Sequence, residues 1–288
     1  MRAAAILGPG NFQKYLAKFR NIGDADWTAG APELPDQAEV AVIFGGDGTI
    51  HRHLSTLVNL QTPVLVVPCG SGNDLARALK LRSVRDALAA WRKFLDTRSN
   101  LRAIDLGVIR EVVGEPLAPR EHYFCCVAGV GLDSEIARTA NDLHRWLRAH
   151  GGYALSAPRE FLRFAPFPMS ISSNGNPASP FRPTILAAVA NAPTYGGGMK
   201  IAPQAKLDDG KLDLCVVRDM DVFRLFCLFP TVYFGRHLGF EEVEYGQTPS
   251  VKIETEHPFD VYADGEFVCK TPVEFQVARN ALKVVVPA

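Results

Sequence analysis

Carboxylates in glycine-rich segments are the side chains of this chain best suited to phosphate or metal chemistry. Asp47 lies in Gly45-Gly46-Asp47-Gly48-Thr49, Asp74 ends Pro68-Cys69-Gly70-Ser71-Gly72-Asn73-Asp74, and Asp264 begins Asp264-Gly265-Glu266. Glycine lets the backbone approach a phosphate closely, and a helix N-terminus favours its negative charge. A carboxylate beside a phosphate repels it unless a metal bridges the two, so Asp47 favours Mg-nucleotide.

Each segment also has a plainer interpretation. A glycine-rich turn can simply join a strand to a helix, and Asn73 or Asp74 can cap the helix that follows. Arg77 falls one helical turn later, where it could meet phosphate or remain a solvated surface residue. Asp264-Gly265 taken alone is typical of a hairpin turn. These alternatives stay open at the level of single segments.

The elements that carry the first two segments are strand–turn–helix units. Val40 to Phe44 is an apolar run followed by a helical pattern from Ile50 to Asn59. Pro63 to Val67 is a second apolar run, with helical patterns from Leu75 onward and from Val84 to Leu95. Fully apolar strands joined by helices predict a parallel sheet covered by helices.

Beyond Asn100 the pattern changes to short β-type runs separated by Gly, Pro, Asn and Asp, which is typical of an antiparallel domain. These runs are Ile104–Arg110, His122–Val127, Met169–Ser173, Ile185–Ala190, Leu212–Val217, Val251–Thr255 and Phe259–Ala263. Helical insertions are expected at Asp133–Phe164 and Asp221–His237, and Ala281–Val286 is apolar enough to return to a core. We therefore predict an α/β nucleotide-binding domain (1–103 and 272–288) and a β-rich, sandwich-like substrate domain (104–271).

Composition supports an ordinary globular protein. The 288 residues favour two domains, and 31 basic against 31 acidic side chains give no global charge for binding nucleic acid. No apolar run approaches the roughly 18 residues needed to span a bilayer. The six cysteines are scattered, which predicts reduced thiols and a cytoplasmic protein.

In chain order, these segments resemble the diacylglycerol kinase catalytic family, which includes bacterial lipid kinases and the sphingosine and ceramide kinases. The resemblance runs from Val40 to Val286. The first segment is shared with NAD kinases and phosphofructokinases, whereas a glycine triplet followed by Leu-Asp-Asp-Gly points more narrowly to lipid kinases. Its other carriers are Ala128–Asp133, Tyr195–Met199 and Ala202–Gly210, together with Asp264-Gly265-Glu266.

The resemblance implies an active site in a cleft between the two domains, with ATP and Mg²⁺ as cofactors. Asp47 would act on the nucleotide phosphates through Mg²⁺, Asp264 would be the general base on the acceptor hydroxyl, and Glu266 would hold catalytic Mg²⁺. A structural Mg²⁺ would lie at Asp209 with the carbonyls of Leu207 and Lys211. The residues implied to contact nucleotide are Gly45, Gly46, Gly48, Thr49, Gly70, Ser71, Gly72, Asn73, Asp74 and Arg77.

Three stretches depart from the family pattern. Gly8-Pro9-Gly10-Asn11 replaces an Asn-Pro-x-Ser-Gly-like turn, and Asn11–Glu39 is short for the two elements expected there, so the presence of both stays open. After Thr49, where a carboxylate is frequent, the chain has His51-Arg52-His53. Histidines at i and i+2 face different ways on a helix, which favours exposed surface residues over a metal site.

We expect an ATP-dependent kinase that phosphorylates a hydroxyl of diacylglycerol or a related lipid at a membrane surface, such as the inner face of the membrane. The alternatives are a kinase for a soluble substrate such as NAD, and an inactive nucleotide- or lipid-binding module. No nucleic-acid partner is expected, and a homodimer stays open. The apolar helix at 221–237 is predicted to be mainly core, so docking would fall to basic residues: Arg77, Lys80, Arg82, Arg85, Arg92 and Lys93.

Overall fold

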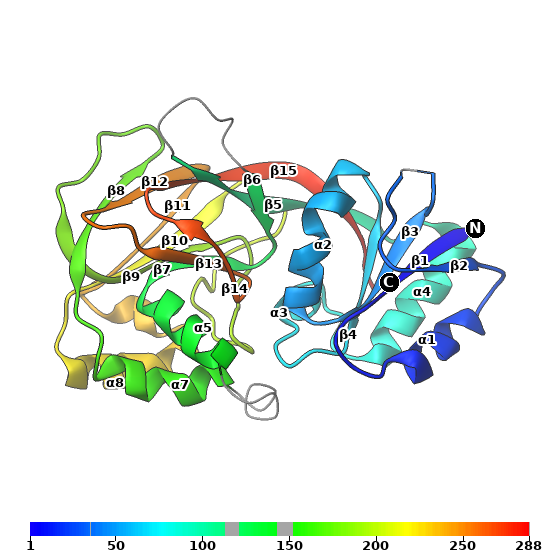
Figure 1. Cartoon of the computed structure of the whole chain (residues 1–288), viewed down its shortest axis with the longest axis horizontal. Coiled ribbons are helices and arrows are strands. Elements are labelled where there is room, and N and C mark those ends of the chain that lie inside the picture. Colours follow the sequence, from blue (N-terminus) through cyan, green and yellow to red (C-terminus); the bar gives the residue numbers. More distant parts are fainter. Residues whose placement is uncertain (35, 113–120, 143–151, 288) are drawn as a thin grey trace.

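The computed structural model describes residues 1–34, 36–112, 121–142 and 152–287. Its N-terminal part is a parallel sheet in the order β4-β3-β1-β2, with helices packed against it (Figure 1). All six residues of β3 are buried, as expected for a strand covered on both faces. The elements are β1 (Arg2–Leu7), α1 (Gln13–Arg20), β2 (Asp26–Ala29), β3 (Val40–Gly45), α2 (Asp47–Asn59), β4 (Val64–Pro68), α3 (Asp74–Ala78) and α4 (Val84–Thr97).

Both elements whose presence the sequence left open are there. The short stretch before β3 forms α1 and β2, and Phe19 of α1 is buried with its ring edge-on to Phe44 at 5.1 Å. β2 is only four residues long and pairs parallel with β1 at the sheet edge. The short stretch therefore forms both expected elements, and each of them is short.

The second part is built from antiparallel strands with helices along one side (Figure 1). Together with the parallel sheet, it confirms the predicted two-domain α/β fold class. Its elements are β5 (Leu101–Glu111), β6 (Glu121–Phe124), β7 (Val127–Gly131), α5 (Leu132–Asp142), α7 (Gly152–Phe161), β8 (Phe167–Ser173), β9 (Arg182–Ala190), β10 (Leu212–Arg218), α8 (Val222–Val232), a 3₁₀ turn (His237–Gly239), β11 (Val243–Thr248), β12 (Ser250–Thr255), β13 (Asp260–Ala263), β14 (Glu266–Lys270) and β15 (Val273–Val285).

The last strand, β15, joins the two parts. It begins beside β12, where Val273 pairs with Ile253, and near its end Val284 pairs with Val64 of β4 in the parallel sheet. The return of the C-terminal run to the first core is as expected from its apolar character. The domain division at 104 and 272 stays a prediction, because β5 and β15 lie side by side as long continuous strands.

A buried carboxylate fixes an irregularity in that long pair. Asp105 of β5 accepts the backbone N–H of Gly210 through Oδ2 and that of Asn280 through Oδ1, both at 2.7 Å. The register of β5 and β15 shifts between Ala278 and Leu282, so Asn280 lies in the bulge. Asp105 thus ties the Leu-Asp-Asp-Gly segment to the strand that connects the two parts.

The helix α8 corrects one prediction. Leu225, Leu228 and Val232 are buried, but Phe223 and Phe234 are exposed, so the apolar residues of 221–237 are not all core. The helix begins as expected, since the Asp221 side chain accepts the Arg224 N–H at 3.0 Å. Within the described ranges, no helix has the length and apolar character needed to cross a bilayer.

Candidate active site

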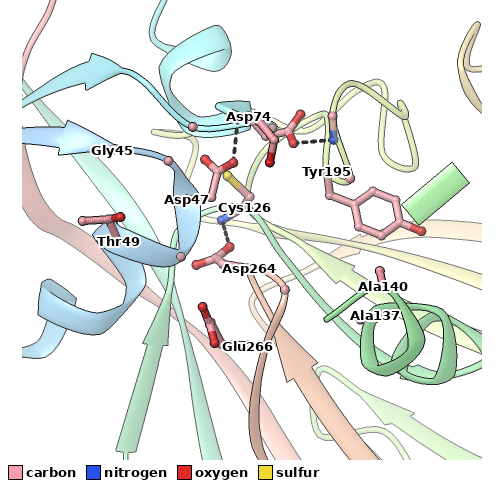
Figure 2. A pocket seen from close by; sticks show the side chains of 18 of the residues that line it. Gly45, Asp47, Thr49, Asp74, Cys126, Ala137, Ala140, Tyr195, Asp264 and Glu266 are labelled. Atoms are coloured by element: carbon pink, nitrogen blue, oxygen red, sulfur yellow. Dashed lines mark hydrogen bonds between the residues drawn. The ribbon is translucent and has the colours of Figure 1, made fainter. Parts of the chain in front are cut away.

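A cavity of about 670 Å³ lies where the two parts meet, and both parts supply its walls. Figure 2 shows four carboxylates from three separate segments, those of Asp47, Asp74, Asp264 and Glu266, gathered around it. These side chains are up to 219 positions apart in the sequence (266 − 47). The fold therefore brings together the three segments singled out by their residue types.

Two glycine turns form one wall by approaching backbone to backbone. A Cβ placed on Gly70 would lie 2.4 Å from the Cα of Gly46, which no real side chain tolerates. A Cβ on Gly45 would lie 2.6 Å from Oγ1 of Thr49, whose buried side chain packs in this space. Glycine is required here for close packing of the two turns, and this packing leaves their edges open to the cavity.

Asp47 links the two turns. The helix α2 begins at Asp47, earlier than the sequence pattern indicated, and the Asp47 carboxylate accepts the N–H of Asp74 at 3.0 Å and that of Leu75 at 3.1 Å. These are the first amides of α3. Asp47 therefore caps a helix from a neighbouring turn.

The simpler prediction, that Asn73 or Asp74 caps α3, is wrong. Asn73 has φ +55° and makes no side-chain cap; its Oδ1 accepts the Gly70 N–H at 2.9 Å and its Nδ2 donates to the Gly70 carbonyl at 2.6 Å. The Asn73 side chain closes the second glycine turn and does not line the cavity. The cap comes from outside because the left-handed Asn73 directs its side chain back along the turn.

The setting of Asp47 disfavours its charge. Burial, followed by the negative charge of Asp74, raises the pKa of Asp47 to about 6, against the pull of its two backbone hydrogen bonds. The charge of Asp264 adds to this effect. A cation bound here would relieve the same repulsion, so this cluster is suited to a divalent metal.

Asp74 ties the parallel-sheet part to the second part. Its Oδ2 accepts the N–H of Gly197, in the glycine triplet, at 2.9 Å, while its Oδ1 receives Nη1 of Arg77. Arg77 also donates to the Gly72 carbonyl at 3.0 Å and does not line the cavity. Its guanidinium thus holds Asp74 and the second turn in place. A direct contact of Arg77 with nucleotide stays a prediction.

Asp264 has the most elaborate setting of the four acids. Its backbone is left-handed, with φ +51°, and its side chain is only 1% exposed. Oδ1 accepts the N–H of Cys126 and Oδ2 that of Cys125, both at 2.8 Å. The carboxylate faces the cavity, as a base acting on a bound acceptor must (Figure 2).

His51 corrects the prediction of an exposed histidine. It lies on α2 with a side chain only 14% exposed, and its Nδ1 is 3.3 Å from Oδ2 of Asp264. Burial lowers the pKa of His51, but the hydrogen bond and charge of Asp264 outweigh it and raise the pKa above its ordinary value. Sequence spacing showed only that His51 and His53 diverge; it gave no signal that a segment 213 positions away covers one of them.

Glu266 lies beside the N-terminal turn of α2. A Cβ on Gly48 would lie 2.6 Å from Oε1 of Glu266, so this carboxylate sits against the first turn of α2. Within the part of the chain that is described, no three His, Cys, Asp or Glu side chains form a metal site by themselves. Mg²⁺ is commonly bound by one or two carboxylates plus substrate phosphates, and these acids fit that kind of site.

Asp133 and Tyr195 form a buried hydrogen-bonded pair on the cavity wall. In the sequence they were singled out only as members of the segments that resemble the family. The Tyr195 hydroxyl donates to Oδ1 of Asp133 at 2.7 Å, and burial raises the pKa of Asp133 to about 7. A Cβ on Gly129 would lie 2.1 Å from Oδ2 of Asp133, so that glycine makes room for the carboxylate. Both side chains line the cavity beside α5.

The predicted structural metal position at Asp209 lies in a turn remote from the cavity. Oδ1 of Asp209 accepts the Lys211 N–H at 3.2 Å, and the Leu207 carbonyl accepts the Asp105 N–H at 2.6 Å. Among described residues, Asp209 forms no ion pair with Lys or Arg, the contact that would have favoured a plain turn. The Mg²⁺ site of Leu207, Asp209 and Lys211 stays a prediction.

Most of the residues expected to bind nucleotide line the cavity. Asn73 and Arg77 do not, for the reasons given above. Arg52, Pro9 and Gly10 also line it, and the sequence had treated them as departures from a family pattern. The predicted residues on its walls are Gly45, Gly46, Gly48, Thr49, Gly70, Ser71, Gly72 and Asp74.

Two family models match this chain. Residues 13–109 match the diacylglycerol kinase catalytic domain, and residues 126–286 match the YegS C-terminal NAD kinase beta sandwich-like domain. The second match alone covers more than half of the chain. The matched ranges correspond to the parallel sheet and to the antiparallel part.

Single proteins with similar sequences are diacylglycerol kinases as well. A diacylglycerol kinase of Mycobacterium tuberculosis is 32% identical over 249 residues, covering 86% of this chain and 77% of the relative. A diacylglycerol kinase of Bacillus subtilis is 27% identical over 269 residues, covering 92% and 83%.

Solved structures share the fold. A diacylglycerol kinase structure from Bacillus anthracis superposes with a TM-score of 0.65 at 18% identity, over 99% of this chain and 96% of that one. A yeast NADH kinase complexed with NADH gives a TM-score of 0.60 at 11% identity, over 100% and 84%. At these identities the likeness concerns the fold alone.

Proposed function

Because this chain belongs to the diacylglycerol kinase family, we propose that it transfers the γ-phosphate of ATP to a hydroxyl of diacylglycerol or a closely related lipid. The observation that carries the proposal is the position of Asp264. It is a buried carboxylate held by two backbone amides, and it faces a cavity whose opposite wall is formed by two glycine turns. A base and a phosphate cradle on either side of one space are what phosphoryl transfer to an alcohol needs.

The hydrogen bonds of Asp264 leave it able to accept a proton. A carboxylate offers about four lone-pair positions. Cys125 N–H and His51 take two on Oδ2, and Cys126 N–H takes one on Oδ1. The remaining position on Oδ1 can receive the acceptor's hydroxyl hydrogen as its oxygen bonds to the γ-phosphorus and ADP leaves.

Mg²⁺ fits this site through Glu266 and Asp47, with the nucleotide phosphates completing its oxygen shell. When bound, it would neutralise negative charge on the transferred phosphoryl group. The chain's own contribution is to orient the phosphates at the N-terminus of α2, which favours anions, and along the glycine turn at Gly70 and Gly72. Arg52, exposed on the cavity wall, adds a cation beside the Gly48 carbonyl that it contacts at 3.1 Å.

A labelled-ATP screen tests the proposal. The purified chain is incubated with ATP, Mg²⁺ and either diacylglycerol or sphingoid acceptors in phospholipid vesicles, or NAD in solution. We expect label in a lipid product, and at least ~10²-fold less with D264N, the scale for loss of a general base. Label in NADP would select the soluble-substrate alternative, and nucleotide binding without transfer to any acceptor would select the inactive module.

A further inference from the structure

The outer face of α8 carries aromatic side chains where a surface helix normally carries polar ones. Phe223 and Phe234 are 80% and 73% exposed, and Phe226 is 37% exposed. Cys227 and Pro230 are exposed along the same helix, so its outward stripe is almost free of charge. Phe223, Phe226, Cys227 and Pro230 recur at spacings of one to three residues, which places them along one side of the helix, and Phe234 lies in the turn just after its end.

The end of α7 extends this apolar stripe. The ring of Phe161 lies 5.2 Å from that of Phe226 and 5.1 Å from that of Phe229, so α7 packs directly on α8. Leu162, the next residue, is 71% exposed. We call the surface formed by Leu162, Phe223, Phe226 and Phe234 the α7–α8 face. Large aromatic side chains exposed together in this way mark an interaction surface.

Four exposed cations lie near α7 and α8 without an ion pair to a described residue. Arg159 and Arg163 are exposed on and just after α7, while Arg236 follows Phe234 and Lys200 joins the end of α8 through its N–H to the Val232 carbonyl at 3.0 Å. None of the four makes an ion pair with a described residue. Arg224 is different, because Glu242 neutralises it at 2.7 Å. The exposed acids in the segments that flank α8 are Asp219, Asp221 and Glu241, so the four unpaired cations outnumber them by one.

The exposed rings together with the unpaired cations distinguish between two possible partners of the α7–α8 face, a second copy of this chain and a lipid bilayer. In a symmetric dimer the same patch meets itself, and the unpaired arginines of two copies would be brought together. A bilayer with anionic headgroups instead offers an apolar interior for the rings and negative charge for the surrounding cations. Charge complementarity therefore favours the bilayer over a second copy.

One helix, α5, separates the α7–α8 face from the catalytic cavity. The helix α5 contributes Ala137 and Ala140 to the cavity wall, and on its other side it packs against α7. Arg159 and Arg163 line an open groove of about 710 Å³ on the α5 and α7 side. Figure 1 shows α5, α7 and α8 together along one edge of the second part. A bilayer on this face would lie one helix away from the cavity.

We propose that the α7–α8 face docks on bilayers that contain anionic phospholipid, with the exposed rings inserted at the level of the headgroups. This docking would bring the proposed lipid kinase to its membrane substrate, and only that purpose rests on the proposed function. The docking itself follows from the exposed rings and the surrounding cations.

Co-sedimentation of the full chain with vesicles tests the docking. The vesicles are phosphatidylcholine alone or a mixture with phosphatidylglycerol, and the variants are F223S/F234S and the control F181S, whose Phe181 is 49% exposed outside the face. We expect wild type and F181S to bind the anionic vesicles, and F223S/F234S to bind at least ~10-fold more weakly, as loss of two inserted phenyl groups implies. R159Q/R163Q/K200Q/R236Q should lose the preference for anionic vesicles.

A second measurement does not depend on these variants. Cys227 is the exposed cysteine among the six, so an environment-sensitive dye can be attached there, with C227S as the labelling control. A blue shift of the dye on anionic vesicles supports docking. Equal binding by wild type and F223S/F234S, no dye response on vesicles, or a wild-type dimer that F223S/F234S converts to monomers would each overturn the proposal.

Activity on a short-chain diacylglycerol in free solution separates this inference from the proposed function. F223S/F234S should phosphorylate the dissolved acceptor as well as wild type does and lose activity on the vesicle-bound one. If wild type phosphorylates no lipid in either form yet still binds vesicles, the proposed function fails and the docking stands. If it phosphorylates both while binding no vesicles, the docking fails and the proposed function stands.

Discussion

At the scale of single residues, the acids of the cavity differ in what holds them, and this predicts different responses to mutation. Asp47 is buried beside Asp74, and its pKa of about 6 means that its charge costs stability. The folded-state pKa lies above the ordinary 3.8, so this cost appears as the pH rises from 3.8 through about 6. A buried acid whose charge costs stability is consistent with a role in phosphoryl transfer in addition to its role as the cap of α3.

We therefore expect D47N to lower the rate of phosphoryl transfer by at least ~10²-fold while the free energy of unfolding at pH 7 stays the same or rises. Asparagine keeps an acceptor for one of the α3 amides and carries no charge. Initial rates and urea unfolding at pH 4 and pH 7 provide the two measurements. A near-wild-type rate would remove Asp47 from the mechanism.

His51 makes a contribution of opposite sign. Its pKa is raised by Asp264, so the pair stabilises the fold below pH 6.5, and this contribution is lost as the pH rises through the raised pKa. H51A should therefore reduce the free energy of unfolding by about 1.5–3 kcal/mol at pH 5.5, the range for a hydrogen bond to a charged group, and by less at pH 8.5.

The neighbouring histidine provides the control. His53 lies on the same helix, but its pKa is lowered by burial and by Arg52, so H53A should show no such loss at low pH. A loss in H51A that is equal at both pH values would mean that the imidazole only fills space.

At the scale of elements, the two glycine turns act as one unit because their backbones touch. G70A places a methyl group 2.4 Å from the Gly46 Cα, so the turns must separate, at a cost of about 1–3 kcal/mol in stability. The first amides of α2 and α3 would move apart, and nucleotide affinity should fall. G239A is the matched control, because nothing lies within 4 Å of a Cβ there. Calorimetric titration with ATP, giving equal affinities for the two variants, would count against the phosphate cradle.

At the scale of the whole molecule, the long pair β5 and β15 connects the two parts, and Asp105 fixes its bulge. D105A leaves the Gly210 and Asn280 amides without their acceptor, which should cost about 2–5 kcal/mol for two buried donors. D208A, which removes only the exposed ion pair with Arg102, should cost at most about 1 kcal/mol. Urea denaturation of both variants compares them, and equal losses would show that the bulge does not depend on Asp105.

The sequence by itself predicted most of the strands, the turns that follow β3 and β4, and the family. β3 and β4 are continuous apolar runs, and glycines at 45, 46, 70 and 72 mark the turns at their ends. The apolar runs and the glycines are local features, so they can be recognised without knowledge of the tertiary structure. Motif order then predicted correctly which distant acids line one cavity. Polar segments such as β11 escaped prediction because their pairing with β10, and not their composition, makes them strands.

Only the tertiary structure decided what each site residue touches. The pairing of β13 with β7 places Ala263 opposite Ala128. In this register the Asp264 carboxylate lies within hydrogen-bond distance of the amides of Cys125 and Cys126 and of His51. The Asp47 cap on α3 and the outward rings of α8 arise in the same way, from packing between segments far apart in the chain. The spacing of residues in the sequence fixes the direction of each side chain on its own helix or strand. Its partners depend on how separate elements pack against one another, which local sequence patterns do not predict.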